Sequence, residues 1–418
     1  MSTFIRSGCG EKGSALRVED ALHRMLDAVT PVKGYEQVGL LDAWCRVLHE
    51  PVVAAIDVPS RANAAVDGYA VRAADLPGPG GVAELAVIGT ARAGHPFPGT
   101  VQAGQAVRIM TGAHLPEGAD TVLPQEQVEA QGAGIRVGEG HGQGDNVRLA
   151  GEDIARGTTV LAPGRYLTPP DIGLIASLGQ GEVKVKRRPR VALLSTGDEL
   201  CALGHPLPAG GLYDSNRYTL HAALKRLNVK VMDQGIVPDE PERLREALTR
   251  AAANADVVVS SGGVSVGEAD FVRDVLLALG SIELWKVAMK PGRPIAFGRI
   301  GGAVFIGLPG NPVAALVCFF QFVQPVLEKK MGISERPVVP VFKAIAAHRL
   351  SKKPGRTEFQ RGILDPTPGG WRVRSSGHQG SAILTSMSRG NCLIVLPHDA
   401  GPVEVGEAVD VVPFAAFM

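Results

Sequence analysis

The spacing of apolar residues changes several times along this 418-residue chain. Residues 16–30 repeat apolar side chains at helical intervals, from Leu16 to Val29, which predicts an amphipathic helix. From 57 to 149, short apolar runs are separated by Gly, Pro and Asp, a pattern that is typical of a β-rich domain. Residues 171–179 then predict a short helix that ends at a glycine.

Apolar runs and helical patterns alternate between residues 190 and 330. β-Branched runs predict buried strands, as in RVALLS and DVVVSS, and amphipathic helices are predicted for NRYTLHAALKRLN and PERLREALTRAAAN. This alternation predicts a parallel sheet with helices on both faces, in which ligands bind beyond the carboxyl ends of the strands. The chain then returns to short strands, which predict a small C-terminal β-barrel or sandwich.

Composition and charge narrow the class of protein. Lys plus Arg (43) nearly balance Asp plus Glu (42), which argues against a general nucleic-acid or membrane-surface protein. The five cysteines are isolated, so neither a disulfide framework nor a structural zinc site is expected, and a reducing cytoplasm fits best. The most apolar segment, 303–327, contains Gly-Leu-Pro-Gly-Asn-Pro, which favours a strand, a turn and a helix over a membrane span.

Chemically active groups gather in the loops that follow the predicted strands of the α/β region. Carboxylates, glycine-rich turns and cations occur in turn in STGDE (195–199), VPDE (237–240), SSGGVSVGEAD (260–270), MKPGRP (289–294) and GLPGNP (307–312). Glycines let a backbone approach a ligand closely, and N–H groups at helix starts favour anions. Carboxylates beside such a site suggest a hard cation such as Mg²⁺, shared with phosphate groups.

Each of these features also has a purely local explanation. Asp239 and Glu240 precede a helix and are about as well suited to capping it as to binding a metal. The run 214–216 is typical of a helix N-cap, and Glu199 is suited to capping its own turn. A binding site is favoured over these local explanations because all of the loops are predicted to meet at one edge of the sheet. Neither H-E-x-x-H nor G-x-x-x-x-G-K-[ST] occurs, which argues against a zincin and a P-loop ATPase.

Further motifs lie outside the α/β region. They place Asp67 and Thr111 in the β-rich segment, Asp153 after it, and Arg356, Arg361 and Ser381 near the C-terminus. Turn chemistry alone accounts for each of these positions.

Nine motifs taken together nevertheless resemble one family. In order along the chain they are AAVDGYAVR, VRIMTGA, LAGEDI, RVALLSTGDEL, VVVSSGGVSVGEAD, KPGRPIAFG, GLPGNPVAA, GRTEFQRG and GNCLIVLP. They resemble the molybdopterin molybdenumtransferases, which include bacterial MoeA, the gephyrin E domain and the plant molybdenum insertases. The likeness runs from about residue 16 to residue 418.

The resemblance implies a multidomain α/β and β protein. The parts expected are a flexible tail (1–15), an elongated discontinuous domain I (16–56 and 150–187), an inserted β-rich domain II (57–149), an α/β domain III with a central parallel sheet (188–336) and a β-barrel domain IV (337–418). It further implies a homodimer whose site lies between domains III and IV of one subunit and domain II of the other.

The resemblance also implies an activity and a set of site residues. Such proteins insert molybdate into adenylylated molybdopterin with Mg²⁺-dependent release of AMP. An adenylyltransferase makes their substrate, and cofactor-accepting apoenzymes take their product. Glu199, Asp239 and Asp270 would serve Mg²⁺ and the phosphoanhydride. Lys286 and Lys290 would be catalytic groups, and Gly262, Gly263, Ser265 and Arg293 would bind the adenylylated substrate. Arg361 and Ser381 would bind molybdate. The other subunit of the dimer would supply Asp67, Thr111 and Asp153.

Three points qualify these expectations. Some relatives have lysine where this chain has Arg293, and arginine keeps the charge while favouring bidentate oxyanion contacts. Glu268 is interpreted as a solvated helix start. The alternative activities are an adenylyltransferase, which would not carry the 57–149 insertion, and a gephyrin-like scaffold, which depends on further domains and a long linker.

Overall fold

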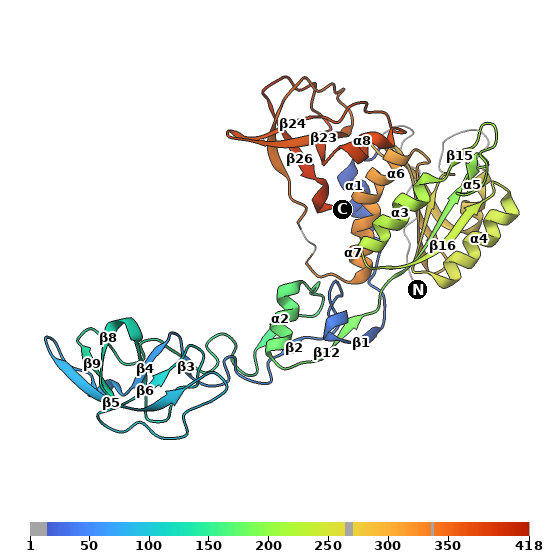
Figure 1. Ribbon diagram of the computed structural model, residues 1–418. Coiled ribbons are helices and arrows are strands. Elements are labelled where there is room, and N and C mark those ends of the chain that lie inside the picture. Colours follow the sequence, from blue (N-terminus) through green and yellow to red (C-terminus); the bar gives the residue numbers. More distant parts are fainter. Residues whose placement is uncertain (1–14, 264–270, 336–337, 418) are drawn as a thin grey trace.

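The computed structural model describes residues 15–263, 271–335 and 338–417. The molecule is elongated, with a β-rich part at one end and an α/β part beside a β-barrel at the other (Figure 1). Within these described ranges, no helix is both long enough and apolar enough to cross a membrane. The residue bounds given above for the four domains stay predictions.

The α/β part is built on a six-stranded sheet. Its spatial order is β16 (Lys230–Val237), β13 (Arg190–Thr196), β17 (Val257–Ser261), β21 (Ala303–Leu308), β20 (Pro294–Ile300) and β18 (Gly280–Lys286). The first four strands are parallel, as the sequence predicts. β20 runs antiparallel to both of its neighbours, β21 and β18, so the sheet is mixed. A short hairpin around Gly301 joins β20 to β21 and needs no crossover helix.

Helices cover both faces of this sheet. They are α3 (Ser215–Arg226), α4 (Pro241–Asn254), α5 (Phe271–Leu279), α6 (Pro312–Cys318) and α7 (Gln324–Met331), with a π-helical turn, Phe319–Val323, joining the last two. Side chains alternate along β13, so that Val191 and Leu193 enter the core with α3 and α6, while Ala192 and Leu194 pack with α4. Burial on both faces explains why these strands are continuous apolar runs.

The β-rich end is a second six-stranded sheet. Its order is β7 (Thr121–Pro124), β4 (Gly68–Val71), β6 (Gln105–Ile109), β5 (Val82–Ala91), β9 (Gly134–Gly138) and β8 (Val128–Gln131). Two short strands, β3 (Asn63–Ala64) and β10 (Val147–Arg148), pair with each other where the chain enters and leaves this region. The predicted β-rich texture is therefore confirmed.

Segments from either side of that insertion pair to form the connecting region. β1 (Tyr35–Gly39) pairs with β12 (Glu182–Lys186), and β2 (Val52–Val53) pairs with β11 (Thr159–Leu161). The predicted short helix is α2 (Pro169–Ser177), which begins with a capping box between Thr168 and Asp171. The first helix, α1 (Val18–Asp27), packs instead on α7 and shares the core of the α/β part.

The C-terminal residues form a closed five-stranded barrel. Its strands are β23 (Thr357–Thr367), β24 (Gly370–Ser375), β22 (Phe342–Ala346), β26 (Ala408–Pro413) and β25 (Cys392–Leu396), closed by pairing of β25 with β23. A short helix, α8 (Leu384–Arg389), lies beside it. One strand of this sheet comes from elsewhere, since β19 (Met289–Lys290) leaves the α/β part and pairs in parallel with β23.

Candidate functional site

The carboxyl ends of β13, β16, β17 and β21 meet at one edge of the α/β sheet, which we call the rim. Thr196 ends β13 and Ser261 ends β17, and the amide of Gly262 donates to the carbonyl of Leu308 (3.1 Å) at the end of β21. The hydroxyls of Ser195 and Ser260 are buried there, and neither has a hydrogen-bond partner within the described residues. The structure thus brings together the strand-end loops that the sequence analysis selected.

Gly262 is required by the geometry of the rim. Its φ is +95°, and a Cβ at this position would lie 2.2 Å from the carbonyl oxygen of Thr196. Gly263 follows with a φ of +65°, so two consecutive residues adopt conformations that side chains disfavour. The backbone can therefore pass close to β13, as expected for a loop that approaches a ligand.

Asn216 is a rim residue that the sequence analysis missed. Its Nδ2 donates to Ser261 Oγ (2.8 Å) and to the carbonyl of Gly310 (2.7 Å), which ties the two glycine loops together. The run 214–216 was interpreted as a helix cap, and Asp214 does cap α3 by accepting from the amide of Arg217. The sequence signal that could have identified Asn216 is an amide side chain at the second position of a helix that starts at the rim.

The rim carboxylates Asp239, Glu240 and Glu199 have different environments. Asp239 is half-buried and accepts a hydrogen bond from Thr196 Oγ1, while its own amide donates to Asp198 Oδ1 (3.2 Å). Glu240 is the N-cap of α4, and within the described residues its side chain makes no capping hydrogen bond. Helix capping therefore does not explain either acid. Glu199 is exposed and folds back over Gly197, where a Cβ would lie 2.6 Å from its Oε2.

These carboxylates have the right chemistry for a hard cation but do not complete a metal site. Within the described ranges, no three His, Cys, Asp or Glu side chains lie close enough together to hold an ion. Oxygen ligands such as those of Glu199 and Asp239 suit Mg²⁺. Asp270, Ser265 and Glu268 fall outside the described residues, so the predicted third carboxylate has no place in this geometry.

The predicted cations lie next to the barrel. Lys286 is exposed at the end of β18, and Lys290 lies on β19 with its Nζ 3.7 Å from Glu358 Oε2. Arg293 is exposed and lines a cavity of about 410 Å³ together with Arg356. The α/β part and the barrel therefore both supply cations to this cavity or its border.

Arg361 is enclosed rather than open to solvent. Its Nε donates to Ser386 Oγ (3.0 Å) and its guanidinium to the carbonyl of Gly380 (2.9 Å), and burial lowers its pKa to about 10. The loop that it holds carries Ser381, whose carbonyl accepts from the amide of Val313 (3.0 Å) in the first turn of α6. Arg361 thus fixes a barrel loop against the GLPGNP turn.

Strand alternation separates the two arginines of GRTEFQRG. The side chains of Arg356, just before β23, and of Glu358 lie on one face of the strand, and those of Phe359 and Arg361 lie on the other. Lys290 is the strand partner of Glu358, so it shares the face of Arg356 and not that of Arg361. The two arginines of the motif therefore lie in different environments.

Asp67 and Thr111 meet at the β-rich end. The amide and the hydroxyl of Thr111 both donate to Asp67 Oδ1 (2.7 Å each), and these hydrogen bonds hold the pKa of Asp67 below its usual value. Asp153 is exposed, and its amide donates to the carbonyl of Val58 (3.0 Å). The strands β4 and β6 that flank this pair lie at the opposite end of the molecule from β16 (Figure 1), so one chain does not join them to Glu199.

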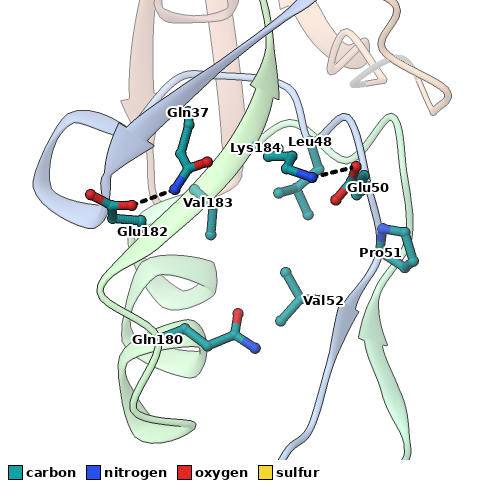
Figure 2. Close-up of a pocket in the computed structure, with 9 residues that line it drawn as sticks. All are labelled: Gln37, Leu48, Glu50, Pro51, Val52, Gln180, Glu182, Val183 and Lys184. Atoms are coloured by element: carbon teal, nitrogen blue, oxygen red, sulfur yellow. Dashed lines mark hydrogen bonds and ion pairs between the residues drawn. The ribbon is translucent and has the colours of Figure 1, made fainter.

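A separate polar cavity lies in the connecting region. It has a volume of about 210 Å³ and is lined by residues of β1, β12 and β2, such as Gln37 and Lys184, and by Glu50 and Gln180 from the segments that precede β2 and β12 (Figure 2). Lys184 Nζ donates to Glu50 Oε1 (2.9 Å), and Gln37 donates to Glu182. Its polar groups thus bind one another, and none of the predicted site residues lines it.

Family models match most of the chain. The MoeA N-terminal region (domain I and II) matches residues 16–179, a probable molybdopterin binding domain matches 192–329, and the MoeA C-terminal region (domain IV) matches 343–414. These matches follow the order of the motifs along the sequence.

Individual relatives are similar over almost their full length. A molybdopterin molybdenumtransferase of Haemophilus influenzae is 44% identical over 96% of this chain and 98% of its own length. One from a Nostoc species is 37% identical over 91% of this chain and 89% of its own length. The crystal structure of a molybdopterin biosynthesis MoeA protein from Pyrococcus horikoshii covers 96% of this chain and all of its own, with 29% identity and a TM-score of 0.83.

Proposed function

Because this chain belongs to the MoeA family of molybdopterin molybdenumtransferases, we propose that it inserts molybdate into adenylylated molybdopterin and releases AMP. The observation that supports this most is the convergence at the rim of Asp239, Glu199 and the Gly262 turn, beside Lys290. A glycine turn and a helix start suit phosphates, whereas the neighbouring carboxylates suit a cation that neutralises them.

The adenylylated substrate is bound along the rim. Its phosphates approach the backbone of Gly262 and Gly263, where two consecutive glycines allow close contact. Lys286, Lys290 and Arg293 offset the charge of the phosphates and of the dithiolene. Glu199 and Asp239, completed by Asp270, are the residues that would hold Mg²⁺, which supplies neutralisation of the phosphoanhydride when bound.

Molybdate is bound where the barrel loop meets α6. Ser381 lies on that loop, and the buried guanidinium of Arg361 fixes the loop by donating to its carbonyls. We therefore assign Arg361 to the molybdate site as the residue that shapes it, with the Ser381 hydroxyl and nearby amides as the donors.

The active unit is a homodimer. β4, which follows Asp67, and β6, which precedes Thr111, lie at the opposite end of the molecule from β16 (Figure 1), so Asp67 and Thr111, together with Asp153, act on the site of the other subunit. The connecting region offers an apolar surface for such pairing, since Leu41 is 94% exposed and Trp44 is 59% exposed. An adenylyltransferase supplies the substrate, and apoenzymes take the product. The free cysteines suit a reducing cytoplasm.

A reconstitution tests the proposed function. The purified chain is incubated with adenylylated molybdopterin and Mg²⁺, molybdate is titrated against tungstate, and AMP release is measured. We expect AMP release that requires the oxyanion. Asp270→Asn should retain the adenylylated substrate and release little AMP, and Arg361→Ala should mainly raise the molybdate concentration required.

Other outcomes would contradict the proposal. Consumption of ATP with molybdopterin, in place of AMP release, would make the chain an adenylyltransferase. Capture of partner proteins without any AMP release would make it a scaffold. Normal AMP release by Asp270→Asn would remove that residue from the metal site, and an unchanged molybdate dependence would remove Arg361 from the molybdate site.

A further inference from the structure

Glu358 is a buried carboxylate at the junction between the α/β part and the barrel. Its Oε1 accepts from Arg356 Nε (3.1 Å), and its Oε2 accepts from Gln360 Nε2 (3.2 Å) and lies 3.7 Å from Lys290 Nζ. Two cations from different parts of the chain therefore share one carboxylate. The proposed function gives Lys290 a role but gives none to Glu358 or Arg356.

The backbone builds the cluster directly. β19 pairs in parallel with β23, and the register places Lys290 opposite Glu358 as a cross-strand pair of opposite charge. Arg356 and Gln360 lie two residues to either side of Glu358, so alternation points all three to the same face. Gln360 is itself fixed, because its Nε2 also donates to the carbonyl of Ser351 (2.9 Å).

The energetics favour a fixed carboxylate with two partly free cations. A buried carboxylate is costly unless both oxygens are partnered, and here both are. The side chains of Lys290 and Arg356 remain 46% and 41% exposed, so each keeps N–H donors that face away from Glu358. Arg356 also lines the 410 Å³ cavity beside Arg293. Glu358 is thus inside the protein, whereas Arg356 reaches the cavity and Lys290 is partly exposed next to Met289, which also lines the cavity.

We propose that Glu358 is a positioning residue that holds Lys290 and Arg356 in the geometry required for turnover, an inference that rests on the proposed function. It acts through the two cations and does not touch the substrate. Arg356 thereby becomes a further substrate-facing cation of the site, contributed by the barrel. Glu358 thereby couples the barrel strand β23 to β19, the strand that carries Lys290.

Lys352 shows what a merely structural buried charge looks like in the same barrel. Its Nζ donates to three backbone carbonyls, those of Lys353 (3.2 Å), His398 (3.2 Å) and Ala400 (3.0 Å). Its hydrogen bonds all go to the backbone, and burial lowers its pKa although nearby Glu358 acts in the opposite direction. The hydrogen bonds that Glu358 accepts, in contrast, come from side chains. This contrast favours a role for Glu358 in arranging charge.

The main test is Glu358→Gln in the complete protein, assayed for AMP release beside the wild type. We expect kcat to fall about 10- to 100-fold, as misplaced groups commonly cause. The KM for the adenylylated substrate should stay within about threefold, because both positive charges remain. Glu404→Gln is the matched control, since Glu404 pairs with Arg349 (2.8 Å) on the surface of the same barrel. An unchanged kcat in Glu358→Gln would overturn the proposal.

A second variant tests the proposal even if Glu358→Gln fails to fold. Arg356→Lys keeps the charge of an exposed side chain but loses the Nε–H that Glu358 accepts. We expect a kcat loss of about 3- to 10-fold, and the double variant with Glu358→Gln should lose no more than Glu358→Gln alone, because the Arg356 contact is already broken in that variant. Losses that simply multiply would overturn the coupling.

The reactivity of Lys290 toward a chemical label can be measured without substrate turnover. Lys290 should react with an amine-directed reagent at least about twofold faster in Glu358→Gln than in the wild type, because its carboxylate partner is gone. Lys343, which pairs with Asp410 (2.8 Å), serves as the internal reference in the mass spectrum. If the wild type releases no AMP, the proposed function fails. If the wild type is active but neither Lys290 labelling nor kcat changes, only this inference fails.

Discussion

The rim and the β-rich end each contain a threonine that donates to an aspartate, yet the two pairs differ in what surrounds them. Thr196 and Asp239 join the ends of neighbouring parallel strands, where Glu199 and the Gly262 turn also lie. Thr111 and Asp67 join a turn to the end of β6, and the mixed sheet around them brings no other predicted site residue to the pair. Parallel topology gathers several groups at one edge of a sheet, whereas the mixed sheet leaves the Asp67–Thr111 pair apart from the other predicted site residues.

The largest expected effect is at the rim, from Gly262→Ala. The added Cβ would meet the carbonyl of Thr196 at 2.2 Å, so the turn must move. We expect a loss of about 2–4 kcal/mol in the free energy of unfolding and more than a hundredfold loss of AMP release. Gly301→Ala is the control, with a φ of +55° but nothing within 4 Å, and should cost about 1 kcal/mol. Thermal denaturation and AMP release of both variants check this.

The next largest effect is expected from two variants that separate the charge of Asp239 from its hydrogen bond with Thr196. Asp239→Asn removes the charge, and we expect AMP release to fall about a hundredfold. Thr196→Val keeps the charge and removes one hydrogen bond, so a loss of about fivefold to tenfold is expected. Steady-state rates with saturating Mg²⁺ measure both. Equal losses in the two variants would show that Asp239 matters only for the shape of the loop.

Mixing subunits tests whether the β-rich end is completed by the rim of another chain. Asp67→Asn and Asp239→Asn are each expected to be nearly inactive alone. Refolded together, half of the dimers are mixed and carry one intact site, so about a quarter of the wild-type activity should return. No recovery would mean that both residues serve a site within one chain. The AMP release of the mixture, with dimer content from light scattering, is the measurement.

The smallest effect concerns pH. Hydrogen bonds from the amide and the hydroxyl of Thr111 lower the pKa of Asp67 in the folded protein. Its stabilising contribution is therefore present above the unfolded pKa of about 4 and is lost as pH falls through the lower folded value. Protection of the Thr111 amide from hydrogen exchange should decline in that acid range and should be independent of pH there in Asp67→Asn. A decline at the same pH in both proteins would contradict it.

Sequence reasoning succeeded where local pattern and topology agree. The apolar runs predicted the parallel strands, and the loops after them therefore met at one edge. It was less informative about side chains whose partners are distant in the sequence. Asn216 links Ser261 to Gly310, and Glu358 faces Lys290, but these contacts depend on register between strands and loops that no short motif records.

The motif GRTEFQRG illustrates the same limit. It displays two arginines that look equivalent in the sequence, but strand alternation places one at a cavity and the other in the interior. The antiparallel pair β18 and β20 was missed for a related reason, since an apolar run does not encode its direction. Motif likeness, in contrast, indicated the family because the order of nine short segments is specific.

The segment that contains β19 has a mechanical consequence. Within five residues it is bonded to three places: Ala288 donates to Leu16 (2.7 Å), Val287 donates to Arg293 (2.8 Å), and Thr357 of the barrel donates to Ala288 (2.8 Å). A rotation of the barrel must therefore pull on the same strand that carries Lys290. The position of this lysine is thus tied to the position of the barrel by backbone hydrogen bonds, independently of its side-chain contact with Glu358.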